Sequence, residues 1–133
     1  MAGALAAELA RRGHEVSAHG ALAPGDRADW AWASQAAAEE VADGRADMGV
    51  VCCWTGTGAS IAANKVPGIR AALCTDAQTA AGARRWNDAN VLALSLRTTS
   101  EAVLGEILDS WFESGPSSDP DDIANWEYLD RRR

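Results

Sequence analysis

A strand, a glycine-rich turn and a helix follow one another without a break between Met48 and Lys65, and this unit most constrains the fold. Residues 48–53 (MGVVCC) are apolar, which predicts a short buried strand. The turn at 55–58 (TGTG) breaks that strand, and small residues then favour a helix up to Lys65. The first N–H groups of such a helix point back over the turn, where an oxyanion or phosphate is favoured. Cys53 is therefore expected at the mouth of an anion site.

The same alternation of apolar runs and helical segments continues along the chain and predicts a parallel α/β sheet. The expected strands are 15–19, 48–53, 69–74 and 91–96, and the expected helices are 2–12, 29–43, 60–65, 76–86 and 100–113. Strands separated by helices imply right-handed crossovers, so ligands bind beyond the carboxyl ends of the strands. Cys53, Cys74 and Leu96 all fall near that edge.

The 133 residues are enough for one domain with its own core, which we place at 1–114. Residues 115–133 form a polar tail, in which a linker precedes one amphipathic turn at 123–129. This turn is expected to dock through Ile123 and Trp126, with a partner subunit as one candidate surface. Met1 opens directly into a helix with no capping residue. The first strand of such a sheet normally precedes that helix, so we expect this strand to be missing from the chain.

Composition excludes several classes of protein. No segment has the length of a membrane span or the pattern of a signal peptide, so a cytoplasmic protein is expected. The net charge of −7 argues against a nucleic-acid surface, because the only basic cluster is 131–133. The three cysteines lack metal-type spacing and are interpreted as reduced thiols. An anionic substrate would therefore need a local arginine or a helix N-terminus.

Two segments, CWTGTGASIAANKVPGIRAALC at 53–74 and RRWNDANVLALSLR at 84–97, carry a resemblance to a known family. They resemble the type B ribose-5-phosphate isomerases and the related galactose-6-phosphate isomerase subunits, over about 2–112. The resemblance implies a three-layer flavodoxin-like (Rossmann-like) domain that isomerises a phosphorylated sugar without a cofactor or a metal. It also implies a homodimer or homotetramer whose sites are built across the subunit interface.

The resemblance assigns roles to individual residues. Cys53 falls where the family has the base that moves a proton between C1 and C2 of the open-chain sugar, and Thr55 belongs to the catalytic loop behind it. Arg97 matches an arginine that the family uses on the phosphate. The full set of expected substrate-binding residues is Trp54, Gly56, Thr57, Gly58, Ser60, Trp86, Asn87 and Arg97.

The chemistry of Cys53 is consistent with that role. A free thiol with a pKa of about 8.5 is made more acidic beside a helix N-terminus, which gives a base suited to proton transfer next to a carbonyl. Backbone amides after Cys53 would stabilise the enediolate oxygens. The simpler alternative is a small buried hydrophobic residue at the end of a strand.

Two functions remain open after this comparison. Trp86 stands where the family has a ring-opening histidine, and the family's Asp-His pair is not in this chain. The first function is catalytic isomerisation of a sugar phosphate. The second is a non-catalytic or specificity-altered subunit that binds a sugar phosphate.

The other conspicuous residues have plainer interpretations. Cys52, Cys74 and Trp111 are expected in the core, and Arg84 and Arg85 at the surface or an interface. His14 and His19 are expected at the surface. The remaining tryptophans near loops are predicted to form an aromatic wall over a sugar or a subunit contact: Trp30, Trp32, Trp54 and Trp86.

Overall fold

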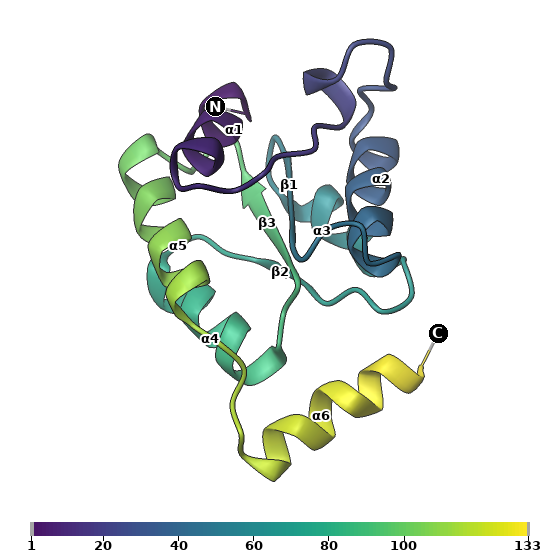
Figure 1. Cartoon of the computed structure of the whole chain (residues 1–133), viewed down its shortest axis with the longest axis vertical. Coiled ribbons are helices and arrows are strands. Elements are labelled where there is room, and N and C mark those ends of the chain that lie inside the picture. Colours follow the sequence, from purple (N-terminus) through teal and green to yellow (C-terminus); the bar gives the residue numbers. More distant parts are fainter. Residues whose placement is uncertain (1, 133) are drawn as a thin grey trace.

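The centre of the molecule is one sheet of three parallel strands. A computed structural model describes residues 2–132. It contains β1 (Gly49–Cys53), β2 (Ala71–Leu73) and β3 (Val91–Ser95) in the order β1-β3-β2. All five residues of β3 are buried, as expected for a strand with neighbours on both edges and helices on both faces. Figure 1 shows these layers, and they confirm the predicted α/β class.

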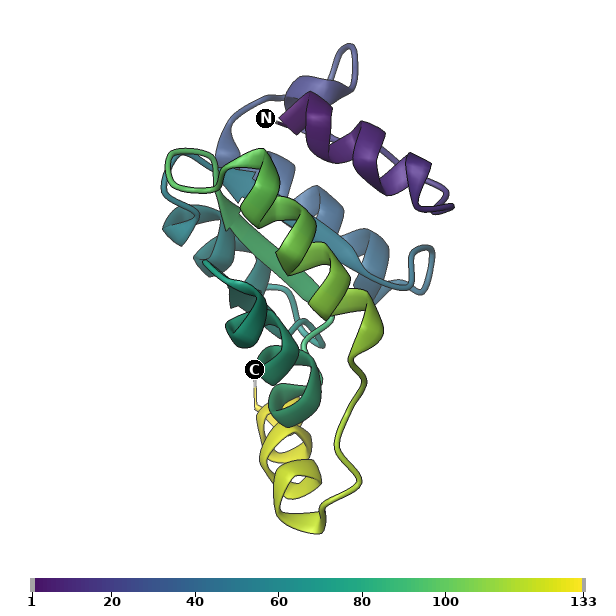
Figure 2. The same ribbon diagram turned by 90° about the vertical axis from the view of Figure 1, so that its left-hand side faces the viewer.

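Helices cover both faces of this sheet. Their bounds are α1 (Ala2–Arg11), α2 (Trp30–Ala42), α3 (Thr57–Asn64), α4 (Ala77–Asn87), α5 (Glu101–Glu113) and α6 (Pro120–Arg131), with a 3₁₀ turn η1 (Gly20–Leu22). On one face α1, α4 and α5 pack against Leu92 and Leu94, and Trp111 of α5 is fully buried there as predicted. On the other face α2 and α3 pack against Val91 and Ala93. Figure 2 shows α4 and α5 together in front of the sheet.

Side-chain caps fix where two of the predicted helices begin. The carboxylate of Asp76 accepts a hydrogen bond from the N–H of Thr79, and the hydroxyl of Ser100 accepts one from Val103. Each bond satisfies one of the free N–H groups in the first turn of a helix. Short polar residues before an apolar run therefore located these helix starts to within one residue.

The predicted strand at 15–19 is wrong. Residues 14–19 belong to no strand, and Val16 is 40% exposed. The N–H of Gly49 donates to Asn90, and the carbonyl of Cys53 accepts from Leu96. In a parallel pair every second residue bonds to the neighbouring strand, so the N–H and C=O groups of Val50 and Cys52 point away from β3, toward the other edge of β1. Within residues 2–132, no strand pairs with that edge. The segment therefore buries no apolar face, and nothing fixes it in the sheet.

Two further details differ from expectation. Helix α3 begins at Thr57 rather than Ser60, because Gly56 adopts a left-handed conformation (φ 81°) that lets the helix start immediately after the turn. Arg84 is only 7% exposed, whereas a surface or interface position was predicted. It lies on the side of α4 that faces α5, with its guanidinium 5.5 Å from the ring of Trp111 and bonded to the carbonyl of Ala89.

The tail forms a helix of three turns rather than one. Pro120 lies in the first turn of α6. The carboxylate of Asp119 caps this helix by accepting a hydrogen bond from the backbone N–H of Asp121. Trp126 is buried, and α6 packs against α4 of its own chain. Figure 1 places α6 at the end of the molecule where the strands begin. Arg133 of the basic cluster and Met1 lie outside the described residues.

Candidate active site

Cys53 is the last residue of β1, and its side chain lies on the face covered by α3. The N–H of Ala59, in the first turn of α3, donates to Sγ of Cys53 at 3.4 Å. The strand, the turn and the helix thus place one sulfur directly against a helix N-terminus.

Gly56 lets the turn lie flat against the sheet. A Cβ atom on this residue would lie 2.6 Å from Cδ1 of Leu73 and 3.0 Å from the carbonyl oxygen of Leu94. A side chain would therefore push the turn away from β3 and away from Cys53. A Cβ on Gly58 would meet the ring of Trp30 at 2.9 Å, so the first turn of α2 forms a wall beside the first turn of α3.

The threonines of the turn form its polar surface. The hydroxyls of Thr55 and Thr57 are 2.9 Å apart, and both residues are exposed. The N–H of Ser60 bonds to the carbonyl of Gly56, so Ser60 has no free amide for a ligand in the turn. Its side chain instead lines a shallow hollow on the outer surface of α3 with Ile61, Asn64 and Lys65.

A second loop, after β3, is joined to the first. The backbone N–H of Arg97 donates to the carbonyl of Trp54 at 2.9 Å, and the hydroxyl of Ser95 donates to the same oxygen at 3.0 Å. Ser95 also accepts from the N–H of Thr98. Arg97 and Trp54 are both exposed, so an unburied cation lies beside the Cys53 turn.

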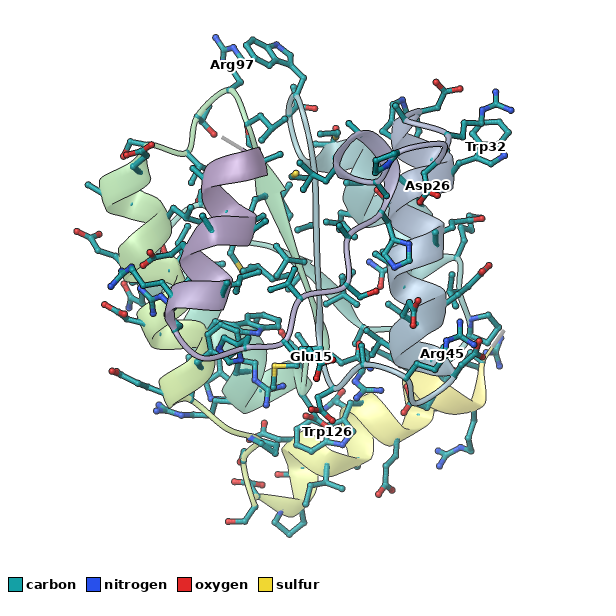
Figure 3. The ribbon with its side chains drawn as sticks, turned by 45° about the horizontal axis from the view of Figure 1, so that its top comes forward. Glu15, Asp26, Trp32, Arg45, Arg97 and Trp126 are labelled. Atoms are coloured by element: carbon teal, nitrogen blue, oxygen red, sulfur yellow. The ribbon has the colours of Figure 1, made fainter. Side chains whose placement is uncertain are left out.

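Trp86 and Asn87 lie at the opposite end of the sheet from Cys53. They form the last turn of α4, which runs back toward the amino ends of the strands, and Asn90 just beyond bonds to Gly49 at the start of β1. Five residues of strand at about 3.3 Å each separate that end from Cys53 by roughly 15 Å. Figure 3 shows Arg97 at one end of the molecule and Trp126 of α6 at the other. One chain therefore does not bring all the predicted site residues together.

Trp86 borders a shallow groove along α4. A Cβ on Gly82 would lie 2.7 Å from the indole of Trp86, so the ring lies over that glycine one turn back. The groove is lined by Ala72, Leu73, Asp76, Gln78, Thr79, Gly82, Ala83, Trp86 and Asn87. The four exposed tryptophans do not form a single wall: Trp30 and Trp54 lie near the Cys53 turn, whereas Trp86 lies at the opposite end of the sheet.

The other two thiols are held in their neutral form. Burial raises the pKa of Cys74 to about 11, with a smaller contribution from the charge of Asp76. Burial also raises the pKa of Cys52, with a smaller contribution from Cys53. Neutral thiols are poor bases and poor nucleophiles. Cys53 differs from both in accepting a hydrogen bond from the first turn of a helix.

The arrangement is suited to proton transfer at a carbon next to a carbonyl. It combines a thiol, a turn whose hydroxyls and helix N-terminus favour negative charge, and an exposed arginine. In the part of the chain that the structure describes, no cluster of three histidine, cysteine or carboxylate residues is arranged to hold a metal ion.

Comparison with known proteins identifies the family. The family model described as "Ribose/Galactose Isomerase" matches residues 1–122. The chain belongs to the ribose/galactose isomerase family. It is 49% identical over 80 residues to galactose-6-phosphate isomerase subunit LacB of Clostridium acetobutylicum, over 60% of this chain and 46% of that protein. It is 39% identical over 107 residues to ribose-5-phosphate isomerase B of Escherichia coli K12, over 80% of this chain and 71% of that protein.

The fold of this family member matches solved structures of the same kind. Ribose-5-phosphate isomerase B of Clostridium thermocellum superposes with a TM-score of 0.87 at 37% identity, covering 96% of this chain and 84% of that one. These comparisons confirm the family that the segments at 53–74 and 84–97 indicate. This chain spans about half the length of LacB. None of the helices in residues 2–132 is long and apolar enough to cross a bilayer.

Sequence reasoning missed two residues of this candidate site. Ser95 joins the loops that carry Trp54 and Arg97, and its signal was a lone hydroxyl at the end of an otherwise apolar strand. In the sequence, Trp30 is only one of several tryptophans near loops. Its contact with Gly58 depends on how α2 packs on α3, which no local pattern reveals.

Proposed function

We propose that this chain catalyses aldose-ketose isomerisation of a phosphorylated sugar, of the ribose 5-phosphate and ribulose 5-phosphate type. The observation that carries the proposal is the Sγ of Cys53 at the N-terminus of α3, 3.4 Å from the N–H of Ala59. Membership of the ribose/galactose isomerase family supports the reaction class.

The proposed mechanism uses Cys53 as the base. Its thiolate removes the proton from C2 of the open-chain aldose, and the electron pair forms an enediolate across C1 and C2. The hydroxyl proton of O2 moves to O1, and the thiol of Cys53 returns the carbon-bound proton to C1 as the C2 carbonyl forms, which gives the ketose and restores the thiolate. Thr55 and the amides of Gly56, Thr57 and Gly58 surround the enediolate oxygens, and each well-aimed donor is worth about 3 kcal/mol.

The proposed site is shared between two chains. Trp86 and Asn87 lie roughly 15 Å from Cys53 in their own chain by the strand length, so they reach a Cys53 turn only in a second copy. A homodimer, or a homotetramer built from dimers, meets this requirement. Helix α6 extends this surface, since it packs against α4. Tyr128 and Leu129 of α6 are more than half exposed and available to a partner subunit.

The direct test is Cys53→Ala, with Cys52→Ala as the matched control. A panel of pentose and hexose phosphates is assayed for aldose-ketose interconversion. We expect Cys53→Ala to abolish turnover while the thermal unfolding temperature changes little, because the change removes one sulfur atom at a half-buried position. Cys52→Ala is expected to keep turnover. Near-normal turnover by Cys53→Ala on the best substrate would refute the mechanism.

Arg97→Ala tests the phosphate assignment. We expect it to raise KM far more for a phosphorylated sugar than for the unphosphorylated analogue, because a charge-assisted bond to phosphate is lost. Arg97→Lys is expected to restore only part of the affinity, since lysine lacks the planar fork. Equal losses on both sugars would assign Arg97 a structural role instead.

Sedimentation and mixed assemblies test the shared site. A 14.0 kDa monomer that turns over substrate would contradict it. Mixing inactive Cys53→Ala chains with inactive Asn87→Ala chains is expected to restore part of the activity, because one site in a mixed dimer then has both residues intact. Absence of recovery in a confirmed mixed dimer would place the site within one chain.

A second candidate is a non-catalytic or specificity-altered subunit that binds a sugar phosphate. The observation that favours it is Trp86, which stands where the resemblance implies a ring-opening histidine, together with 49% identity to a protein named as a subunit. Calorimetric binding of sugar phosphates without turnover on any member of the panel would favour this candidate. Either form is proposed to work in the cytoplasm, where three free thiols stay reduced, and cell fractionation tests that location.

A further inference from the structure

The turn that carries Trp86 and Asn87 ends in an unusual backbone conformation. Asp88 has φ 44° and ψ 46°, and it is the only non-glycine residue in 2–132 with positive φ. Aspartate tolerates this left-handed region better than most residues, but the conformation still has to be held by its surroundings. Asp88 caps the last turn of α4, so the position of that turn, with Trp86 and Asn87, relative to the sheet depends in part on what holds Asp88.

Arg70, which directly precedes β2, holds this turn at both ends. Its Nε donates to the carbonyl of Asp88 at 2.8 Å, and its Nη2 donates to the Asp88 carboxylate at 3.3 Å. Its backbone N–H donates to Oδ1 of Asn90 at 2.8 Å. Arg70 thus connects the start of β2 to the turn, while Nη1 of Arg84, 3.6 Å from the Asp88 carboxylate, contacts the turn from α4 itself.

The same guanidinium also binds the C-terminal helix. Nη1 of Arg70 donates to both carboxylate oxygens of Asp130 on α6, each at 2.8 Å. The Arg70 side chain is 16% exposed, so water screens these contacts less than at an open surface. Helix α6 is anchored to the domain by this pair, by the buried Trp126 and by the bond from the N–H of Ser117 to the carbonyl of Arg85. Arg70 therefore links α6 to the turn.

We propose that Arg70 is a positioning residue. Together with Asp130 it fixes the turn of Trp86, Asn87 and Asp88 in the conformation that the Cys53 site of a second chain requires. The C-terminal helix then acts on catalysis in a neighbouring subunit without touching substrate. This inference rests on the proposed shared site. It predicts that the effect of Arg70 belongs to the chain that supplies the turn, not to the chain that supplies the thiol.

The experiment places Arg70→Gln on one or the other chain of a mixed dimer. A Cys53→Ala chain can supply only the turn, and an Asn87→Ala chain can supply only the thiol. With Arg70→Gln on the Cys53→Ala chain, we expect turnover of ribose 5-phosphate to fall by about tenfold or more, because misplacing a contact group by about 1 Å costs up to hundredfold. On the Asn87→Ala chain it is expected to leave the turnover of the mixed dimer unchanged.

Arg12→Gln is the matched control. Arg12 also joins two helices, by donating to Asp109 at 2.7 Å and to the carbonyl of Gly105 at 3.2 Å, and neither partner belongs to the turn. Arg12→Gln is expected to lower the thermal unfolding temperature. Any loss of turnover in the mixed dimer should be the same whichever chain carries it. Asp130→Asn provides a second variant that leaves the contacts of Arg70 with Asp88 in place, and it should show the same chain dependence with a smaller loss.

The outcomes separate the two proposals. Equal losses with Arg70→Gln on either chain would show a general structural role and overturn the positioning inference. If Arg70→Gln chains do not fold, Asp130→Asn is decisive, and equal losses or no loss on either chain would overturn the inference. Failure of the unmodified mixture to recover any activity would instead refute the shared site.

Discussion

Gly56→Ala is predicted to destabilise the protein more than an alanine at any open glycine turn. Gly56 has φ 81°, and its missing Cβ would lie 2.6 Å from Cδ1 of Leu73 and 2.9 Å from the backbone carbon of Leu94. The end of the leucine side chain can move. The backbone of Leu94 cannot, because β3 is bonded on both edges in the middle of the sheet.

The stability lost in Gly56→Ala has two parts. A left-handed alanine costs about 1–2 kcal/mol, less a few tenths gained from a stiffer unfolded chain, and overpacking against fixed atoms adds about 1–3 kcal/mol. Gly68 separates these parts, since it has φ 85° but a Cβ on it would have no neighbouring atom within 4 Å. We expect a loss of about 1 kcal/mol for Gly68→Ala and about 3 kcal/mol for Gly56→Ala.

Denaturant unfolding at one fixed protein concentration measures both variants, because an oligomer's stability depends on concentration. In thermal unfolding, the midpoint temperature should fall by about 4 °C for Gly68→Ala and about 12 °C for Gly56→Ala. Turnover should fall only for Gly56→Ala, since the turn is displaced from Cys53. Equal losses of stability in the two variants would refute the argument that the turn lies against β3.

Two further predictions concern the thiols and the sheet edge. At pH 8, iodoacetamide is expected to modify Cys53 well before Cys74, because a thiol whose pKa is raised to about 11 stays protonated there, and peptide mass mapping over time would expose the reverse order. In hydrogen exchange, the amides of Val50 and Cys52 should exchange much faster than that of Leu92. Their N–H groups face the unpaired edge of β1, and equal protection would mean that another strand covers that edge in solution.

Local chemistry explains why much of the fold could be predicted. The strands at 49–53, 71–73 and 91–95 are short apolar runs, a pattern typical of strands inside a covered sheet. Asp76 and Ser100 mark the starts of two helices because their own side chains cap them. The Cys53 turn could be predicted for the same reason, since strand, glycines and helix are consecutive in the sequence. Interactions between neighbours in the chain leave a readable pattern.

The remaining features depend on partners distant in sequence, and only the tertiary structure decided them. Residues 15–19 have the composition of a strand, yet a strand exists only where a neighbour completes its ladder. Arg84 is buried because α4 faces α5, and Arg70 binds Asp88 and Asp130, which lie 18 and 60 residues further along the chain. The same holds for the site. The Cys53 turn is bonded to the Arg97 loop because β1 and β3 are adjacent, whereas Trp86 and Asn87 lie at the other end of the sheet because α4 runs antiparallel to the strands. Sequence spacing determines periodicity and capping, but which elements lie side by side is set by the packing of whole faces.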